Sequence, residues 1–235
     1  MKIVYVVHEF PPEDILARGH NVWVLAPQPW LDDDLPSIGF FDEKVEGLSV
    51  RRLLFNPALS PNTVLYEYYN PLLSVYAKDF LREICPDIIH IYHLLHLSSS
   101  IIDAGRELGI PIILTLTDFW FFCPKWIRLK SHGGLCAEDF SWRDCIWCLR
   151  EENDVYHRIT RAFDEGMMKF YFEQATSGND FKFGLVNNGQ ISSLLFAAAG
   201  RLPFLKSQLE KVDQIVCRSE FLSRVFLKKG YFRNG

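Results

Sequence analysis

Four of the six cysteines lie within one short stretch of the chain, at Cys123, Cys136, Cys145 and Cys148. Their spacing is C-x12-C-x8-C-x2-C, and the final pair has the separation of a zinc knuckle. Four thiolates from one loop would complete a tetrahedral structural site, so we predict a structural zinc site here. An iron–sulfur cluster uses the same number of thiolates, and disulfides or free thiols are the alternatives without a metal.

A second group of reactive side chains follows three apolar runs of the sequence. "HEFPPE" begins at His8, "HLLHLSSS" begins at His93, and "TDFWFFCP" begins at Thr117. If the three runs are parallel strands, their carboxyl ends meet at one edge of a sheet, where such folds bind their ligands. We therefore expect His8, His93 and Asp118 to lie in one cleft. The alternative is that the histidines satisfy loop carbonyls and that Asp118 forms an Asx turn.

The elements that must position these residues can be read from the apolar pattern. Six short runs are rich in apolar residues, and most of them are nearly continuous, which is typical of strands buried on both faces of a parallel sheet. They are Ile3–Val7, Val22–Ala26, Leu48–Leu54, Ile88–Tyr92, Ile112–Leu116 and Ile215–Cys217. Helical stretches are expected at Thr63–Ile84, which Pro71 should break, at Ser100–Leu108 and at Ser219–Lys229. The alternation predicts an α/β fold with a Rossmann-like, doubly wound parallel sheet.

Composition excludes several classes of protein. The net charge of −4 supplies no basic field, so we expect no nucleic-acid partner. No apolar run approaches the roughly 20 residues of a membrane span. "MKIVYVV" reads as a first strand rather than a signal peptide, so we expect a cytoplasmic protein, in which structural disulfides are rare. A peripheral contact with the inner membrane face, to which "KFYF" (Lys169–Phe172) would contribute, is the further expectation.

Several segments, in order, resemble the N-terminal half of a GT4-type (group 1) retaining glycosyltransferase. They are "MKIVYVVHEFPP", "RGHNVWVLAP", "GLSVRRL", "PDIIHIYHLLHLSSSIIDAGRELGIPIILTLTDFWFFCP" and "VDQIVCRSEFLSRVFLKKG". The resemblance implies one half of a GT-B fold, with residues 1–235 as the acceptor-binding domain and a cysteine-rich loop insertion at 123–148. Similar cysteine insertions occur in some GT4-type sequences. The donor domain would follow in the full-length chain, so we expect this chain alone to be inactive.

The resemblance also implies roles for individual residues. A hexosyltransferase-like enzyme of this kind moves a sugar from a nucleotide sugar, bound mainly by the donor domain, to a hydroxyl of a small-molecule or glycan acceptor. Asp118 and Thr117 become the candidate catalytic residues. The candidate acceptor-binding residues are His8, Glu9, Phe10, Pro11, His93, His96, Phe119 and Trp120. The aromatic residues among them either stack on sugar rings or form a small core around the cysteine loop.

Two departures from the family pattern bear on this interpretation. Family members usually have a Gly-rich loop and a full helix between "FPP" and "RGH", whereas here only about two turns of helix separate them. Many members also carry His-Asp where this chain has Thr117-Asp118, and a threonine can hydrogen-bond an acceptor but cannot act as a base near neutral pH. A non-catalytic carbohydrate-, nucleotide- or partner-binding module is the alternative. An NAD-dependent dehydrogenase is disfavoured, because no G-x-G-x-x-G follows the first run.

Overall fold

The computed structural model describes residues 1–8, 19–29, 37–57, 60–131, 133–137, 139–163, 166–167 and 191–231. The chain divides into two compact units. Unit 1 comprises Met1–Ser60, Tyr66–Thr117 and Ser207–Gly235, and unit 2 comprises Pro61–Leu65 and Asp118–Lys206. The cysteine-rich segment lies wholly within unit 2, which extends well beyond residues 123–148.

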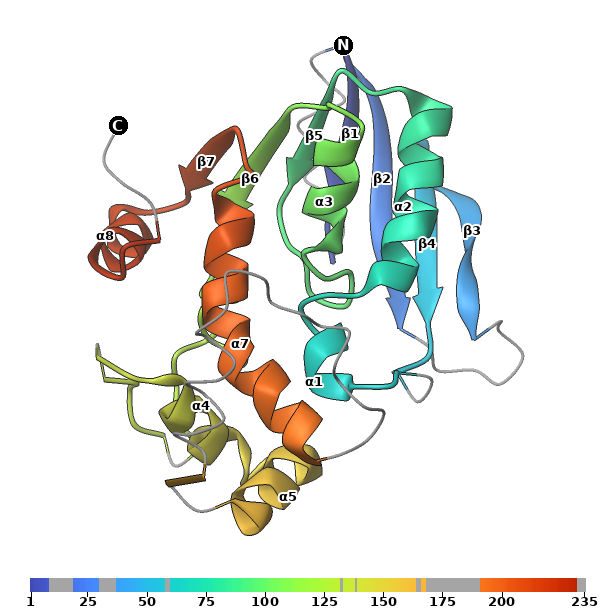
Figure 1. Cartoon of the computed structure of the whole chain (residues 1–235). Helices are drawn as coiled ribbons and strands as arrows, with labels where there is room; N and C mark the ends of the chain where they lie inside the picture. The colour runs from blue at the N-terminus through green and yellow to red at the C-terminus, as the bar shows by residue number, and fades with distance from the viewer. Residues whose placement is uncertain are drawn as a thin grey trace. The chain divides into compact units, whose positions relative to one another are not determined.

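Unit 1 is built on a seven-stranded sheet with the order β3-β4-β2-β1-β5-β6-β7 (Figure 1). All neighbouring strands run parallel except β3 and β4. The parallel strands alone, numbered along the chain, have the order 3-2-1-4-5-6 of a doubly wound dinucleotide-binding sheet. This confirms the predicted α/β class and each of the six predicted strands. Their bounds are β1 Lys2–Val6, β2 Asn21–Pro29, β4 Leu48–Phe55, β5 Ile88–Ile91, β6 Ile112–Leu116 and β7 Gln214–Cys217.

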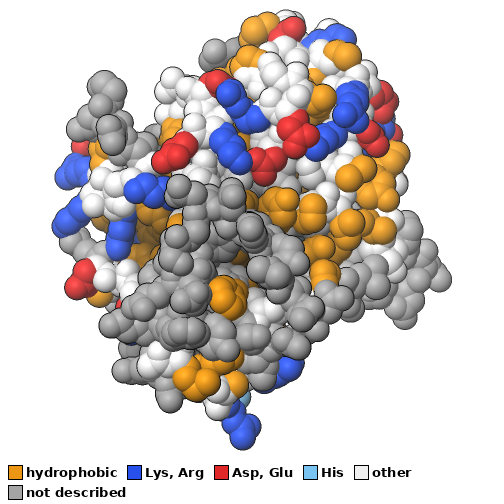
Figure 2. All heavy atoms as spheres, in the orientation of Figure 1, with side chains coloured by type: hydrophobic (Ala, Val, Ile, Leu, Met, Phe, Trp, Pro, Cys, Tyr) orange, Lys and Arg blue, Asp and Glu red, His pale blue; other side chains and the backbone are white. Residues whose placement is uncertain are grey.

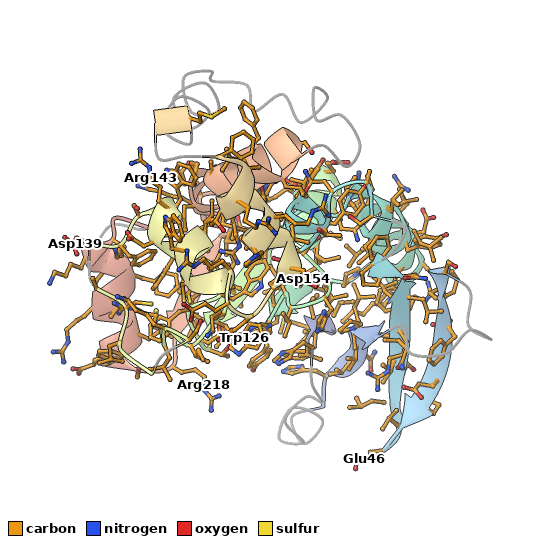
Figure 3. All side chains as sticks on the ribbon, turned by 90° about the horizontal axis from the view of Figure 1, so that it is seen from below. Glu46, Trp126, Asp139, Arg143, Asp154 and Arg218 are labelled. Atoms are coloured by element: carbon orange, nitrogen blue, oxygen red, sulfur yellow. The ribbon has the colours of Figure 1, made fainter. Side chains whose placement is uncertain are left out.

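Strand β3 (Ile38–Val45) was not predicted from the sequence. It joins β4 through a two-residue turn, Glu46-Gly47, in which both residues have positive φ (51° and 85°), as tight hairpins favour. Figure 3 shows Glu46 at the tip of this hairpin. The strand escaped prediction because it lies at the sheet edge, where its burial alternates and its apolar signal is weak.

The central strand explains why the apolar runs are continuous. Ile3, Tyr5 and Val7 pack with residues of β2 and β4 in one buried cluster. Val4 and Val6 point to the opposite face, because successive side chains of a strand alternate, and both are completely buried. A strand covered on both faces has no solvent-facing position at which a polar residue would be favoured.

Helices α2 (Pro71–Ile84) and α3 (Ser100–Glu107) lie side by side in front of the sheet in Figure 1. The predicted break occurs at Pro71, which starts α2 and separates it from the short α1 (Thr63–Tyr66). Asn70 caps α2 by accepting hydrogen bonds from the Leu72 and Leu73 amides (3.1 and 3.2 Å). The last helix, α8 (Glu220–Lys228), begins as predicted after Ser219, whose side chain accepts from the Leu222 amide.

Close packing of α3 on the sheet depends on one glycine. A Cβ at Gly105 would lie 2.7 Å from Ile89 Cδ1 and 3.0 Å from Ile112 Cδ1. Both isoleucines are fully buried, on β5 and β6. The glycine therefore lets the helix backbone approach these two strands, which carry much of the candidate site at their ends.

Acidic and basic side chains are interspersed over the upper part of the face shown in Figure 2. Ion pairs in unit 1 include Lys78–Glu107 and Arg82–Asp79. A surface mixed in this way creates no broad field of one sign, in keeping with the low net charge.

Unit 2 contains α4 (Trp142–Leu149), α5 (Asp154–Ala162) and α7 (Ile191–Leu209) through Lys206. A capping box fixes the start of α4: Ser141 Oγ accepts from the Asp144 amide, and Asp144 accepts from the Ser141 amide (2.7 Å). Leu129 and Leu135 form an antiparallel bridge that returns the chain toward Cys136. Among the helices that the structure describes, none combines the length and apolar character needed to cross a bilayer.

Candidate functional site

The strand order places a topological switch point between β1 and β5. The chain leaves β1 for β2 on one side, and β5 pairs with β1 on the other. In doubly wound sheets, ligands bind beyond the carboxyl ends of the strands at this point. The Tyr92 and His93 amides, which follow β5, both lie within hydrogen-bonding distance of the Val6 carbonyl at the end of β1 (2.8 and 3.4 Å). The residues after the two strands are therefore held beside each other.

His8 and His93 meet at this switch point. Their ring centroids are 4.1 Å apart with an interplanar angle of 44°. His93 is buried, and its Nδ1 accepts a hydrogen bond from the Leu95 amide (2.9 Å). The proton of the neutral ring is therefore on Nε2, which makes Nε2–H a donor. The structure brings together two of the three residues expected to share a cleft.

His96 lies at the surface of the same loop, with a left-handed backbone (φ +62°). Partial removal of water from around its ring lowers its pKa, and the neighbouring His93 lowers it further. Both effects favour the neutral form of the His96 ring.

A partly buried polar cluster lies on β5 and β6, just before the switch point. His90 on β5 stacks on Tyr92 (4.4 Å between centroids), and its Nε2 lies 2.8 Å from Thr115 Oγ1. Burial lowers the pKa of His90 to about 4, which keeps the ring neutral. Burial and the neighbouring Tyr92 raise the pKa of Tyr5 to about 12. These groups form a neutral hydrogen-bonding platform rather than a pair of proton-transfer residues.

The three serines of "HLLHLSSS" serve the fold. The side chains of Ser98 and Ser100 both accept from the Asn70 amide (3.0 and 2.9 Å), and Ser99 Oγ donates to the Tyr68 carbonyl (2.6 Å). All three serines are buried. They tie the loop after β5 to the segment before α2 and so fix the position of His93.

Arg218 is a residue at this edge that the sequence reasoning missed. It directly follows β7, and its amide donates to the Leu116 carbonyl at the end of β6 (3.3 Å). Its charge lowers the pKa of Tyr92, against the larger effect of burial, which raises it. The Arg218 side chain extends away from the ribbon in Figure 3. The sequence could have indicated Arg218, because this residue follows a predicted strand just as His8 and His93 do.

The remaining predicted residues are not all placed at this edge by the structure. Thr117, which follows β6, is half-buried and is the last residue of the Tyr66–Thr117 stretch of unit 1. Asp118 begins the Asp118–Lys206 stretch and so belongs to unit 2. Asp118 Oδ1 accepts from the Trp120 amide (2.9 Å), which is the Asx turn named as its alternative. Glu9, Phe10 and Pro11 lie outside the described residues, as does the Lys169–Phe172 segment.

Most of the aromatic cluster around Trp120 is packed inside unit 2. Trp120, Phe121 and Phe122 are at most 4% exposed, and Trp120 contacts Phe121 edge-on (5.2 Å). Phe119 is half-buried beside Phe122 (5.5 Å). Trp120 therefore belongs to a small core rather than to a surface that could stack on sugar rings. A role of Phe119 in acceptor binding stays a prediction.

The four clustered cysteines line one cavity of about 270 Å³ within unit 2. The structure does not support the predicted zinc site: among the described residues, no three His, Cys, Asp or Glu side chains are placed to hold a metal ion. The thiols share the wall of the cavity without converging on a point, and all are free. Burial and then the neighbouring Cys123 raise the pKa of Cys145 to about 12, and the charge of Arg201 opposes this rise.

Comparisons with known proteins do not assign the chain to a family. No protein-family model matches it, and no curated protein matches it significantly. Solved structures that resemble it include "Trehalose-6-phosphate from E. coli bound with UDP-2-fluoro glucose" (15% identity, TM-score 0.32, 64% of this chain and 38% of that chain). Another is an α,α-trehalose-phosphate synthase (UDP-forming) from Burkholderia vietnamiensis (10% identity, TM-score 0.30, 75% and 42%). This chain thus spans less than half of either, and likeness at these TM-scores carries no argument about function.

Proposed function

We propose that this chain is the acceptor-binding half of a glycosyltransferase of the retaining, GT4-like kind. The observation that carries the proposal is the ring contact of His8 and His93 at the switch point of a doubly wound sheet. The ordered resemblance of the sequence segments to GT4-type enzymes supports the choice of sugar chemistry over the other reactions that such sheets serve.

In this proposal His8 and His93 hold the acceptor. His93 donates from Nε2 to an acceptor oxygen, because its Nδ1 is occupied by the Leu95 amide. Thr117 would hydrogen-bond a second hydroxyl, and Asp118 would orient the reacting hydroxyl or take its proton. The nucleotide sugar would be bound mainly by a donor domain, and the leaving phosphate would assist deprotonation, as the resemblance implies. Arg218 adds a positive charge at the same sheet edge and would favour acceptors that carry an anionic group.

The decisive experiment measures sugar transfer by the product of the intact gene. Radiolabelled UDP-, GDP- and TDP-hexoses are each incubated with a panel of hexoses, hexose phosphates and lipid extracts as acceptors. The expected result is transfer that needs the residues of this chain. Binding of sugars without transfer, by a product that contains a donor domain, would support the non-catalytic module instead.

One substitution tests the acceptor role of His93. His93→Asn keeps an acceptor for the Leu95 amide but removes the donor at Nε2. Loss of one neutral hydrogen bond should lower kcat/KM for the acceptor about 3- to 10-fold. His157→Asn, at an exposed position on α5, is the matched control and should change nothing. Equal kinetic constants for the His93→Asn and His157→Asn variants would show that His93 does not bind the acceptor.

A further inference from the structure

The face of the sheet that points away from α3 carries polar side chains beside the switch point. Ile89 and Ile112 point toward α3, because both would meet a Cβ at Gly105. Successive side chains of a strand alternate, so His90 on β5 and Thr115 on β6 point to the other face. The short contact between His90 Nε2 and Thr115 Oγ1 (2.8 Å) agrees with this placement.

Tyr92 and Arg218 belong to this same face, within unit 1. Tyr92 comes two residues after His90, and the two rings stack (4.4 Å between centroids). In the register of β6 with β7, Thr115 pairs with Val216, and the ladder continues to Arg218, two residues further on. Only β6 separates β5 from β7 (Figure 1), so the backbones of Tyr92 and Arg218 are about 10 Å apart across the sheet.

The polar groups at both ends of this surface are available to a ligand. In the part of the chain that the structure describes, neither the Tyr92 hydroxyl nor the Arg218 guanidinium forms a hydrogen bond or an ion pair. The acidic residue nearest to Arg218 along the chain, Glu220, pairs with Arg224 instead (2.8 Å). Val216, in the same row of the sheet as Tyr92, is 44% exposed. Burial raises the pKa of Tyr92 and the charge of Arg218 opposes this rise, so the two groups act on each other.

The chemistry of this surface suits a ring that carries a negative charge. A tyrosine offers a flat apolar face and a hydroxyl, which together match the surface of a sugar ring. An arginine offers a planar fork of donors that matches a phosphate or a carboxylate. The Thr117 hydroxyl, which is half-buried and follows β6, lies in the row of Arg218. A neutral sugar would make no use of the charge of Arg218, and an anion without a ring would leave Tyr92 and Val216 uncovered.

We propose that the acceptor is an acidic sugar, whose phosphate or carboxylate binds Arg218 and whose ring lies against Tyr92. This assignment rests on the proposed function, and it adds the chemical class of the acceptor and the subsite that selects it. Tyr92 directly precedes His93. A ring held at Tyr92 therefore lies beside the His93 Nε2–H donor, while its anionic group reaches across β6 to Arg218.

The first test measures binding by this chain with isothermal titration calorimetry. The ligands are hexoses, hexose 6-phosphates and hexuronates of the gluco, galacto and manno series, together with inorganic phosphate. One acidic sugar should bind at least about 10-fold more tightly than both its neutral parent and inorganic phosphate, since it alone makes both sets of contacts. Tight binding of a hexose 6-phosphate identifies a phosphate at Arg218, and tight binding of a hexuronate identifies a carboxylate.

The other outcomes overturn the acidic-sugar assignment. Inorganic phosphate that binds as tightly as every acidic sugar would indicate an adventitious ion only. Neutral hexoses that bind as tightly as the acidic ones, with a loss of affinity in His93→Asn, would leave the proposed function intact and reject the subsite. A chain that binds no sugar of the panel would contradict both the subsite and the acceptor role of His93.

The second test uses substitutions at the two ends of the surface. Arg218→Gln removes the charge and should weaken binding of the acidic sugar about 10-fold or more, with no effect on the neutral hexose. Arg218→Lys keeps the charge without the fork and should recover part of the loss. Tyr92→Phe keeps the ring but not the hydroxyl, and should weaken binding of both sugars about 3- to 10-fold. Arg224→Gln, at an exposed position on α8, is the matched control. Equal losses in Arg218→Gln and Arg224→Gln would show a general attraction of anions to this end of the chain and would reject the subsite.

Discussion

His90 should make the protein less stable in mild acid. In the folded protein its ring is enclosed between Tyr5 and Tyr92 and bonded to Thr115, and its pKa is about 4. In the unfolded chain the ring returns to the ordinary value of about 6.5. Above pH 6.5 both states are neutral and the full stability is present. As the pH falls below 6.5, the unfolded chain gains a proton that the folded protein does not, so stability declines until the pH reaches about 4.

The size of the effect follows from linkage. Between the two pKa values, 6.5 and about 4, the complete loss is at most about 3.4 kcal/mol, since each pKa unit corresponds to about 1.4 kcal/mol and solvent screens a ring that is only partly buried. From pH 7 to pH 5 the same relation gives a loss of about 2 kcal/mol from this one histidine. Other titrating groups also respond to pH, so the contribution of His90 is isolated by a variant that cannot titrate.

His90→Gln is the matched variant, because its amide can still reach Thr115 Oγ1. Urea unfolding at pH 7 and pH 5 should show wild type losing about 2 kcal/mol more than the variant over this interval. Histidine NMR of the folded protein checks the cause directly, since the His90 ring should not titrate between pH 7 and pH 5. Equal losses in the two proteins, or a His90 titration midpoint near 6.5, would refute the reasoning.

Two further predictions concern packing and catalysis. Gly105→Ala gains up to about 1 kcal/mol in helix propensity but places a Cβ against Ile89, which should cost about 1–3 kcal/mol. Urea unfolding should show a net loss, and adding Ile89→Val, which removes the clashing Cδ1, should recover stability; a stabilised single variant would contradict this. Under the proposed function, Asp118→Asn in the glycosyltransferase keeps an acceptor for the Trp120 amide but not the charge, so kcat should fall at least about 10-fold while donor affinity stays constant. An unchanged kcat would show that Asp118 only forms the Asx turn and has no catalytic role.

The sequence by itself determined the parallel sheet and several helix ends. Strands buried on both faces favour apolar residues at successive positions, so their largely apolar runs are visible without any structure. Pro71 and Ser219 act through local chemistry, a fixed backbone angle and a capping hydroxyl, and their effects could also be predicted. The edge strand β3 was missed because one-sided burial weakens the apolar signal and because pairing with β4 is decided by the partner strand.

Tertiary structure alone decided which reactive residues meet. The strand order sets β5 beside β1, and the ring contact of His8 with His93 results from that order rather than from any local pattern. The serines after His96 have hydroxyls that could bind a ligand, yet Ser98 accepts from the Asn70 amide and Ser99 donates to the Tyr68 carbonyl. These hydroxyls therefore stabilise the fold. The cysteine spacing indicated a cluster, but whether four thiols share one wall, and whether a buried Arg201 accompanies them, depends on how α4, α7 and the intervening loop pack. The residue type determines which hydrogen bonds and reactions a side chain is capable of. Long-range packing determines which side chains meet and which of their polar groups remain free to bind a ligand.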